Sequence, residues 1–198
     1  MPLHLPDPPT DVANKVRSTV RMFAGNTNHN LKALHGAKAD RVDVTTPHQV
    51  FTMGLDDVTS GAGLEKARSV GWRHLVVADG KPIASAETTL AQDGKTHVPG
   101  HVNEGPFVNA TAEAEAAAQA LPQVAAGDFE LRMLRIPAVY FMALWLHSPA
   151  TDLLVPLAPS PIGQEGQAVP AADVLNELAQ RARPVTPFTG GEPGSHAP

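Results

Sequence analysis

The segment Trp72–Leu90 constrains the fold more than any other part of the chain, because it predicts a β-hairpin with a defined turn. Two runs in which apolar and polar residues alternate flank Asp79-Gly80, and this dipeptide is a strong signal for a two-residue turn. A turn of this length pairs Ala78 with Lys81, and counting outward sets the rest of the register. The resulting cross-strand pairs are Val76 with Ile83, His74 with Ser85, and Trp72 with Glu87.

The other periodic segments predict an α+β fold: an antiparallel or mixed β-sheet built from hairpins, with about three helices packed on it. Pro47 falls between two short strand patterns, which predicts two short strands or one bent edge strand. Each half of the chain reads as a helix followed by a hairpin. Helical patterns occupy residues 10–23, 111–121 and 171–183, and strand patterns occupy residues 41–46, 49–53, 129–136, 139–146 and 152–155.

Proline and glycine indicate where the folded part begins and ends. Residues 1–9 include four prolines, which predicts a flexible N-terminal segment. Residues 184–198 are rich in proline and glycine, which predicts a disordered tail. Residues 10–183 are expected to form a single α+β domain between them.

Composition narrows the class of protein. The chain has no cysteine, which excludes disulfides and thiolate metal sites. The chain has a net charge of −5, whereas nucleic-acid-binding proteins typically carry a basic surface. The chain also has no Lys/Arg cluster that would draw it to an anionic membrane. The N-terminus does not resemble a signal peptide, and the longest apolar run, residues 136–146, is too short to span a bilayer. We therefore expect a cytoplasmic protein, and the Ala-, Pro- and His-rich composition with one tyrosine suggests a bacterial source.

The spacing most typical of a metal site is that of His97, His101 and Glu104. Two imidazoles and a carboxylate are three suitable zinc ligands, and a bound zinc would activate water for hydrolysis. Pro99-Gly100 between the histidines argues against a helix, so the residues are expected in a loop from 97 to 104. A solvated loop without metal is the other interpretation, and the loop context favours it.

The predicted hairpin register places His74 opposite Ser85, with Glu87 diagonal to His74 on the same face. Hydroxyl, imidazole and carboxylate are the groups of nucleophilic catalysis. A serine in the middle of a strand lacks the backbone donors of an oxyanion hole, however. Half-buried packing around a cross-strand hydrogen bond is the alternative, and it is favoured.

Residues 139–146 would present apolar side chains on both faces of a strand. Such a strand must be covered on both sides, either by elements of the same chain or by another subunit. The surrounding stretch from Ile136 to Gln180 contains no lysine or arginine. Aromatic residues are typical of interface cores, so Tyr140 and Trp145 are candidate interface residues.

These observations lead to two functional hypotheses. The first is a non-catalytic protein-binding or assembly protein that contacts a protein partner or self-associates, with no cofactor. The alternative is a small hydrolase that depends on a divalent metal such as zinc at the 97–104 loop, or on the Ser/His face of the 72–90 hairpin. The sequence does not decide whether the protein is an enzyme.

Overall fold

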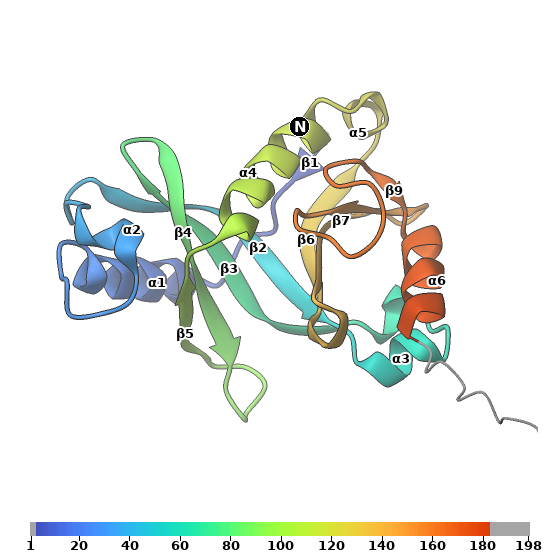
Figure 1. The fold of residues 1–198 in the computed structure, drawn as a ribbon, viewed down its shortest axis with the longest axis horizontal. Coiled ribbons are helices and arrows are strands. Elements are labelled where there is room, and N and C mark those ends of the chain that lie inside the picture. The colour runs from blue at the N-terminus through green and yellow to red at the C-terminus, as the bar shows by residue number, and fades with distance from the viewer. Residues whose placement is uncertain (1–2, 183–198) are drawn as a thin grey trace, which may run out of the picture.

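The computed structural model describes residues 3–182, and its centre is a mixed β-sheet of nine strands (Figure 1). The strand order is β5-β4-β3-β2-β6-β7-β8-β9, and β1 pairs with β6 off this path. The strands are β1 Leu3–His4, β2 Val42–Thr52, β3 Arg68–Ala78, β4 Lys81–Leu90, β5 His97–Asn103, β6 Phe129–Ile136, β7 Phe141–His147, β8 Asp152–Pro156 and β9 Val169–Pro170.

The described residues also form six α-helices and two 3₁₀-helices. The α+β class is therefore confirmed, although the sheet is larger than predicted and the helices are more numerous than about three. None of the described helices combines the length and apolar character needed to cross a bilayer. The helices are α1 Thr10–Phe23, α2 Lys32–His35, α3 Leu55–Thr59, α4 Pro106–Gln119, α5 Pro122–Ala126, α6 Ala171–Ala182, η1 Leu64–Lys66 and η2 Pro137–Val139.

The sheet consists of two meanders joined at their first strands. The central strands β2 and β6 are parallel, and from each of them an antiparallel meander runs outward to β5 and to β9. Helices α1 and α2 precede the first meander, and α4 and α5 precede the second. Each half of the chain therefore has helices followed by a meander, in line with the helix-then-hairpin order read from the sequence.

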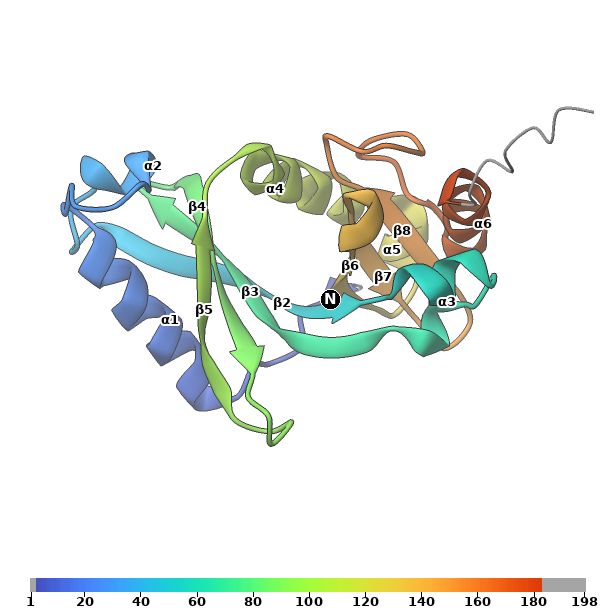
Figure 2. The ribbon, with the colours of Figure 1, turned by 60° about the horizontal axis from the view of Figure 1, so that its bottom comes forward.

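The two faces of the sheet carry different helices (Figure 2). On one face, termed the α4 face, Ala110 of α4 packs in one cluster with Met133 of β6. On the opposite face, termed the α1 face, Val16 of α1 packs in one cluster with Val76 of β3. Helices α3 and α6 lie on the α1 face too, because their cluster contains Leu134, whose side chain points opposite to that of Met133. Side chains of β2, β3, β4 and β6 that point to the α4 face will form the candidate site.

Strand β2 corrects the prediction of two short strands or a bent edge strand. It is one strand of 11 residues in the middle of the sheet, between β3 and β6. A bulge between Thr45 and His48 inserts an extra residue opposite β3, and Pro47 lies within it. A bulge tolerates proline because its residues are not all needed for ladder hydrogen bonds.

The predicted turn of the 72–90 hairpin is confirmed. Ala78 pairs with Lys81, and the two turn residues Asp79 and Gly80 have φ angles of 49° and 75°. Positive φ at both central positions is what the Asp-Gly signal predicts.

The rest of the predicted hairpin register is wrong. A bulge adds Ile83 to β4 opposite the step from Val76 to Val77, immediately after the turn. An extra residue on one strand turns the following side chains of that strand to the other face, so the predicted partners no longer meet. The pairs beyond the bulge are Val76 with Ala84, Leu75 with Ser85, His74 with Ala86, Arg73 with Glu87 and Trp72 with Thr88.

Two segments that were not predicted as strands contain strand residues. The loop expected from 97 to 104 is largely edge strand β5, where Pro99 is tolerated because an edge strand leaves one side unpaired. Within the predicted flexible segment 1–9, Leu3 and His4 pair with β6, and Leu3 packs against the core under α4. The predicted disordered tail, residues 184–198, lies outside the described residues.

Strand β7 is covered on both faces by its own chain. Leu144 belongs to the cluster on the α4 face, and Trp145 belongs to the cluster under α3 and α6. Trp145, one of the two candidate interface residues, is only 4% exposed. Tyr140, the other candidate, lies just before the strand and is 65% exposed. A second subunit is not needed to bury β7.

The close approach of β3 to β4 leads to a testable prediction. A Cβ atom on Gly71 would lie 1.9 Å from the carbonyl oxygen of Thr88 in β4. Gly71→Ala should therefore lower the free energy of unfolding by about 2–3 kcal/mol, measured by urea denaturation. Gly36→Ala is the matched control, because a Cβ there meets nothing within 4 Å. Equal losses in the two variants would contradict the observed strand contact.

Candidate functional site

The bulge at Ile83 separates the three residues of the predicted hydrolase face. Ser85 and Glu87 lie on the α4 face of the sheet, whereas His74 lies on the α1 face. All three side chains are buried. The structure therefore does not bring together the hydroxyl, imidazole and carboxylate that were the less favoured interpretation of this hairpin.

The candidate metal ligands His97, His101 and Glu104 do not converge either. His97 and His101 belong to the edge strand β5, and Glu104 accepts a hydrogen bond from the backbone N–H of Ala33 at 2.7 Å. Within residues 3–182, no three or more histidine and acidic side chains are grouped so as to hold a metal ion.

Trp145 is buried and makes its polar and aromatic contacts within its own chain. Its indole Nε1 donates to Asp152 Oδ1 at 2.7 Å, and His147 Nδ1 lies 2.7 Å from the same oxygen. The guanidinium of Arg132 lies 4.9 Å from the centroid of the Trp145 ring. These contacts satisfy the polar edge of the indole within the chain.

The correct register brings together a charged cluster on the α4 face. Glu87 of β4 receives two arginines: Arg73 Nε lies 3.6 Å from its Oε1, and Arg135 Nη1 of β6 donates to its Oε2 at 2.9 Å. Arg73 also donates to the hydroxyl of Thr111 on α4 at 2.8 Å. We call Arg73, Glu87 and Arg135 the Glu87 cluster.

The Glu87 cluster is buried except for one member. The side chains of Arg73 and Glu87 are 3% and 5% exposed, whereas that of Arg135 is 26% exposed. Burial lowers the pKa of Arg73 to about 10; the charge of Glu87 opposes this shift and that of Arg135 adds to it. Arg73 therefore remains protonated at neutral pH. Two guanidinium groups share one carboxylate. Of the three side chains, only that of Arg135 is partly exposed to solvent.

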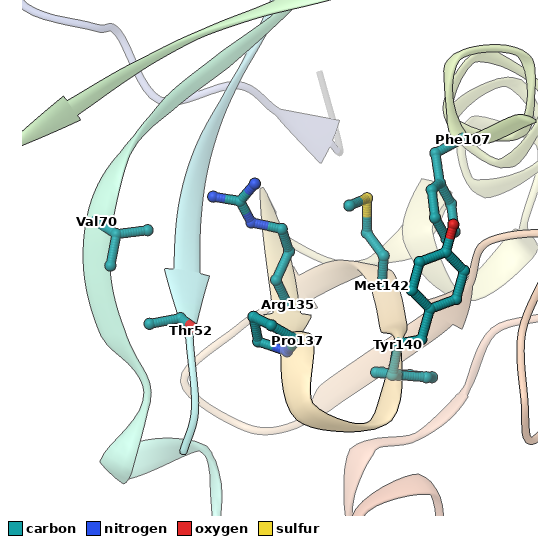
Figure 3. A pocket seen from close by; sticks show the side chains of 8 residues that line it. Thr52, Val70, Phe107, Arg135, Pro137, Tyr140 and Met142 are labelled. Atoms are coloured by element: carbon teal, nitrogen blue, oxygen red, sulfur yellow. The ribbon is translucent and has the colours of Figure 1, made fainter. Parts of the chain in front are cut away.

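Arg135 lines an apolar pocket of about 390 Å³ (Figure 3). Thr52 of β2 and Val70 of β3 lie on one side of Arg135, and Met142 of β7 lies on the other (Figure 3). The pocket also includes Pro137, Phe141, and the aromatic pair of Tyr140 and Phe107. It therefore joins mostly apolar walls to a single charged group.

Tyr140 and Phe107 form the aromatic side of this pocket. Their ring centroids are 5.5 Å apart, and Phe107 comes from the first turn of α4. Tyr140 ends η2 in the left-handed conformation, with φ 51° and ψ 41°. A non-glycine residue rarely adopts this conformation, which costs about 1–2 kcal/mol. The strained backbone holds the only tyrosine of the chain at the pocket, mostly exposed to solvent.

Two histidines of the central strands β2 and β3, His48 and His74, are also buried. Neither ring nitrogen of His48 or of His74 has a hydrogen-bond partner within the described residues. Burial lowers the pKa of His48 to about 3, helped by the charges of Arg73 and His74. Burial also lowers the pKa of His74 to about 4, helped by Arg17. Both imidazoles are therefore neutral at neutral pH.

Sequence reasoning missed Arg73, Arg135 and Phe107. The available signal was a pair of opposite charges, Arg73 and Glu87, inside strands with otherwise buried side chains. With the bulge at Ile83 included, these charges face each other. Without it, Glu87 was paired with a tryptophan, and the charge pair was not visible.

Comparisons with known proteins add no assignment: no family model, no curated protein and no solved structure matches this chain.

The Glu87 cluster predicts unequal effects of removing its members. Glu87→Gln leaves Arg73 buried beside Arg135 with no counter-charge, and it should lower the free energy of unfolding by about 3–5 kcal/mol. Arg135→Met should cost much less, because Glu87 keeps Arg73 as a partner and the methionine fits the apolar walls. Urea denaturation of both variants checks this order. A larger loss in Arg135→Met would mean that the cluster is misassigned.

The buried histidines predict acid sensitivity. Their pKa values in the folded state, about 3 and 4, are below the value of about 6.5 expected in the unfolded chain. As the pH falls below 6.5, the unfolded chain binds protons that the folded protein excludes, so the free energy of unfolding decreases. Each histidine should contribute a slope of up to about 1.4 kcal/mol per pH unit between pH 6 and 4.5.

Urea denaturation across this pH range measures the slope in the wild type and in His74→Leu. The variant should have the shallower slope, since leucine does not titrate. His101→Gln is the control, because His101 is exposed and its replacement should leave the slope unchanged. A slope unaffected by His74→Leu would contradict the burial of a neutral imidazole there.

Proposed function

We propose that this protein is a non-catalytic protein-binding or assembly protein, and that its pocket receives an apolar side chain of a partner polypeptide. The observation that carries the proposal is Tyr140: an exposed aromatic side chain held at an apolar pocket by a strained backbone. Tyr140 lies outside any two-residue hairpin turn, and strained residues of this kind cluster at functional sites.

The lining of the pocket suits a protein partner. Tyrosine presents a large apolar ring together with a hydroxyl, which is why it is enriched in interfaces. The flexible thioether of Met142 adapts to different side chains. A volume of about 390 Å³ lies toward the small end of ligand pockets. Such a pocket accommodates a single anchoring side chain.

The proposal keeps the function expected from the sequence and moves its site. From the sequence, residues 139–146 were expected to contact a partner. In the structure, α4, α6 and their neighbours already cover β7. Tyr140 is the residue of that stretch that stays exposed. The alternative function, a hydrolase, receives no support from the positions of His74, Ser85 and Glu87 or of the 97–104 histidines.

The experiment is a selection of peptides from a random display library on the immobilised protein. Enriched peptides should share an apolar or aromatic anchor residue, and fluorescence anisotropy then gives their Kd. Light scattering after size-exclusion chromatography tests self-association, in which a second copy supplies the anchor. A protein that enriches no peptide and is strictly monomeric would contradict the proposal.

Replacement of Tyr140 separates binding from stability. Tyr140→Gly should weaken the selected peptides at least tenfold, because exposed aromatic anchors typically contribute about 1.4 kcal/mol or more. The same variant should be about 1 kcal/mol more stable than Tyr140→Ala, because glycine adopts the left-handed conformation without strain. Peptide titration and urea denaturation provide the two measurements.

Met22→Ala is the control for this prediction. Met22 on α1 is 71% exposed, and no residue of α1 lines the pocket, so its replacement removes an exposed apolar side chain outside the site. It should leave peptide binding unchanged. Peptides that bind Tyr140→Gly as tightly as the wild type would show that the pocket is not the binding site.

A further inference from the structure

We infer that the pocket recognises the C-terminal residue of its partner, with the apolar side chain in the pocket and the terminal carboxylate on Arg135. The inference rests on the proposed function and deepens it by naming the chemistry of the partner. Its basis is the position of an incompletely neutralised guanidinium inside an apolar site.

The Glu87 cluster contains two positively charged side chains and one negatively charged side chain. One carboxylate lies between two guanidinium groups, at 3.6 Å from Arg73 and 2.9 Å from Arg135. Arg73 is buried and donates as well to Thr111 and to the carbonyl oxygen of Phe107. The cluster therefore has one positive charge more than its carboxylate neutralises, and a bound anion would compensate it.

Arg135 has N–H donors that are not used by its hydrogen bond to Glu87. Among the described residues, its guanidinium makes a single hydrogen bond, from Nη1 to Glu87. A guanidinium has five N–H donors in a planar arrangement that matches a carboxylate. Figure 3 shows the guanidinium between the strand side of the pocket and Met142. Arg135 can therefore hold Glu87 and a second carboxylate at the same time.

The donors of Arg135 lie in a pocket whose other lining residues are mostly apolar. Met142 lies beside Arg135, Val70 and Phe107 line the same pocket, and the Arg135 side chain is 26% exposed. A hydrogen bond between charged groups is stronger in such surroundings than at an open surface.

The size of the pocket selects a chain terminus as the source of the carboxylate. Apolar walls and guanidinium belong to one space of about 390 Å³, so the apolar group and the carboxylate must lie close together. The C-terminal residue of a polypeptide carries both on one residue. An internal Asp or Glu next to an apolar residue would need a second side chain and a continuing backbone in the same space.

Defined peptides test the inference by fluorescence anisotropy with the full-length protein. The probe is fluorescein-labelled Ser-Gly-Ser-Gly-Phe as the free acid, and its partners are the C-terminal amide and the amide of Ser-Gly-Ser-Asp-Phe. The free acid should bind the wild type at least tenfold more tightly than either amide. In Arg135→Met the acid and the amide should bind within twofold of each other, and Arg135→Lys should show an intermediate ratio.

The controls separate this inference from the proposed function. Arg41→Met removes a charge of the same sign from an exposed position that pairs with Asp79, and it should keep the tenfold ratio.

If acid and amide bind the wild type equally and Tyr140→Gly weakens both, the carboxylate inference is overturned while the proposed function stands. Equal binding of the Asp-containing amide and the free acid overturns the choice of a chain terminus. If hexanoate competes as well as the free-acid peptide, the ligand is a small amphiphile and the inference is wrong. If none of the peptides binds at millimolar concentration, the inference fails as well.

Discussion

The carboxylate of Glu87 is the constraint on which the α4 face of this protein depends. It lies on β4, yet it pairs with Arg73 on the neighbouring strand and with Arg135 on β6, across β3 and β2. Arg73 continues the contact to Thr111 on α4. A buried charge is tolerated only when it is paired, so these elements must keep their relative positions. The cluster thereby ties the first meander to the second and to the helix that covers them.

Irregular strand pairing makes this cluster possible. The bulge at Ile83 turns Glu87 to the same face as Arg73, and the bulge at Pro47 gives β2 its register against β3. A third shift, between Val50 and Phe51, accompanies the close approach of β3 and β4 at Gly71. Bulges in natural sheets commonly redirect a side chain toward a functional position. Here they direct charges into the sheet face that adjoins the pocket.

The proposed binding site joins two features of different origin. Arg135 is held by the Glu87 cluster on the sheet, whereas Tyr140 is held by the strained end of η2 and by its ring contact with Phe107. Neither feature alone would specify a partner. A charged group beside an exposed aromatic ring gives both a direction and an apolar anchor, which is how small sites achieve selectivity.

The sequence by itself determined several local elements of this protein. Asp79-Gly80 specified its turn, apolar periodicity specified α1 and α6, and residues 139–146 were correctly identified as apolar on both faces. These features depend on neighbouring residues and on hydrophobic pattern, which are visible in one dimension. Of the two candidate interface residues, Tyr140 is exposed and Trp145 is buried.

Only the tertiary structure decided which side chains meet. One inserted residue at Ile83 replaced the predicted pair of His74 and Ser85 with the pair of Arg73 and Glu87. Because side chains alternate along a strand, a shift of one place exchanges the two faces, and no local pattern announces it. The contact between Glu87 and Arg135 joins residues 48 positions apart in the chain. Such a contact arises from the order of strands in the sheet, which is set by the packing of the whole fold.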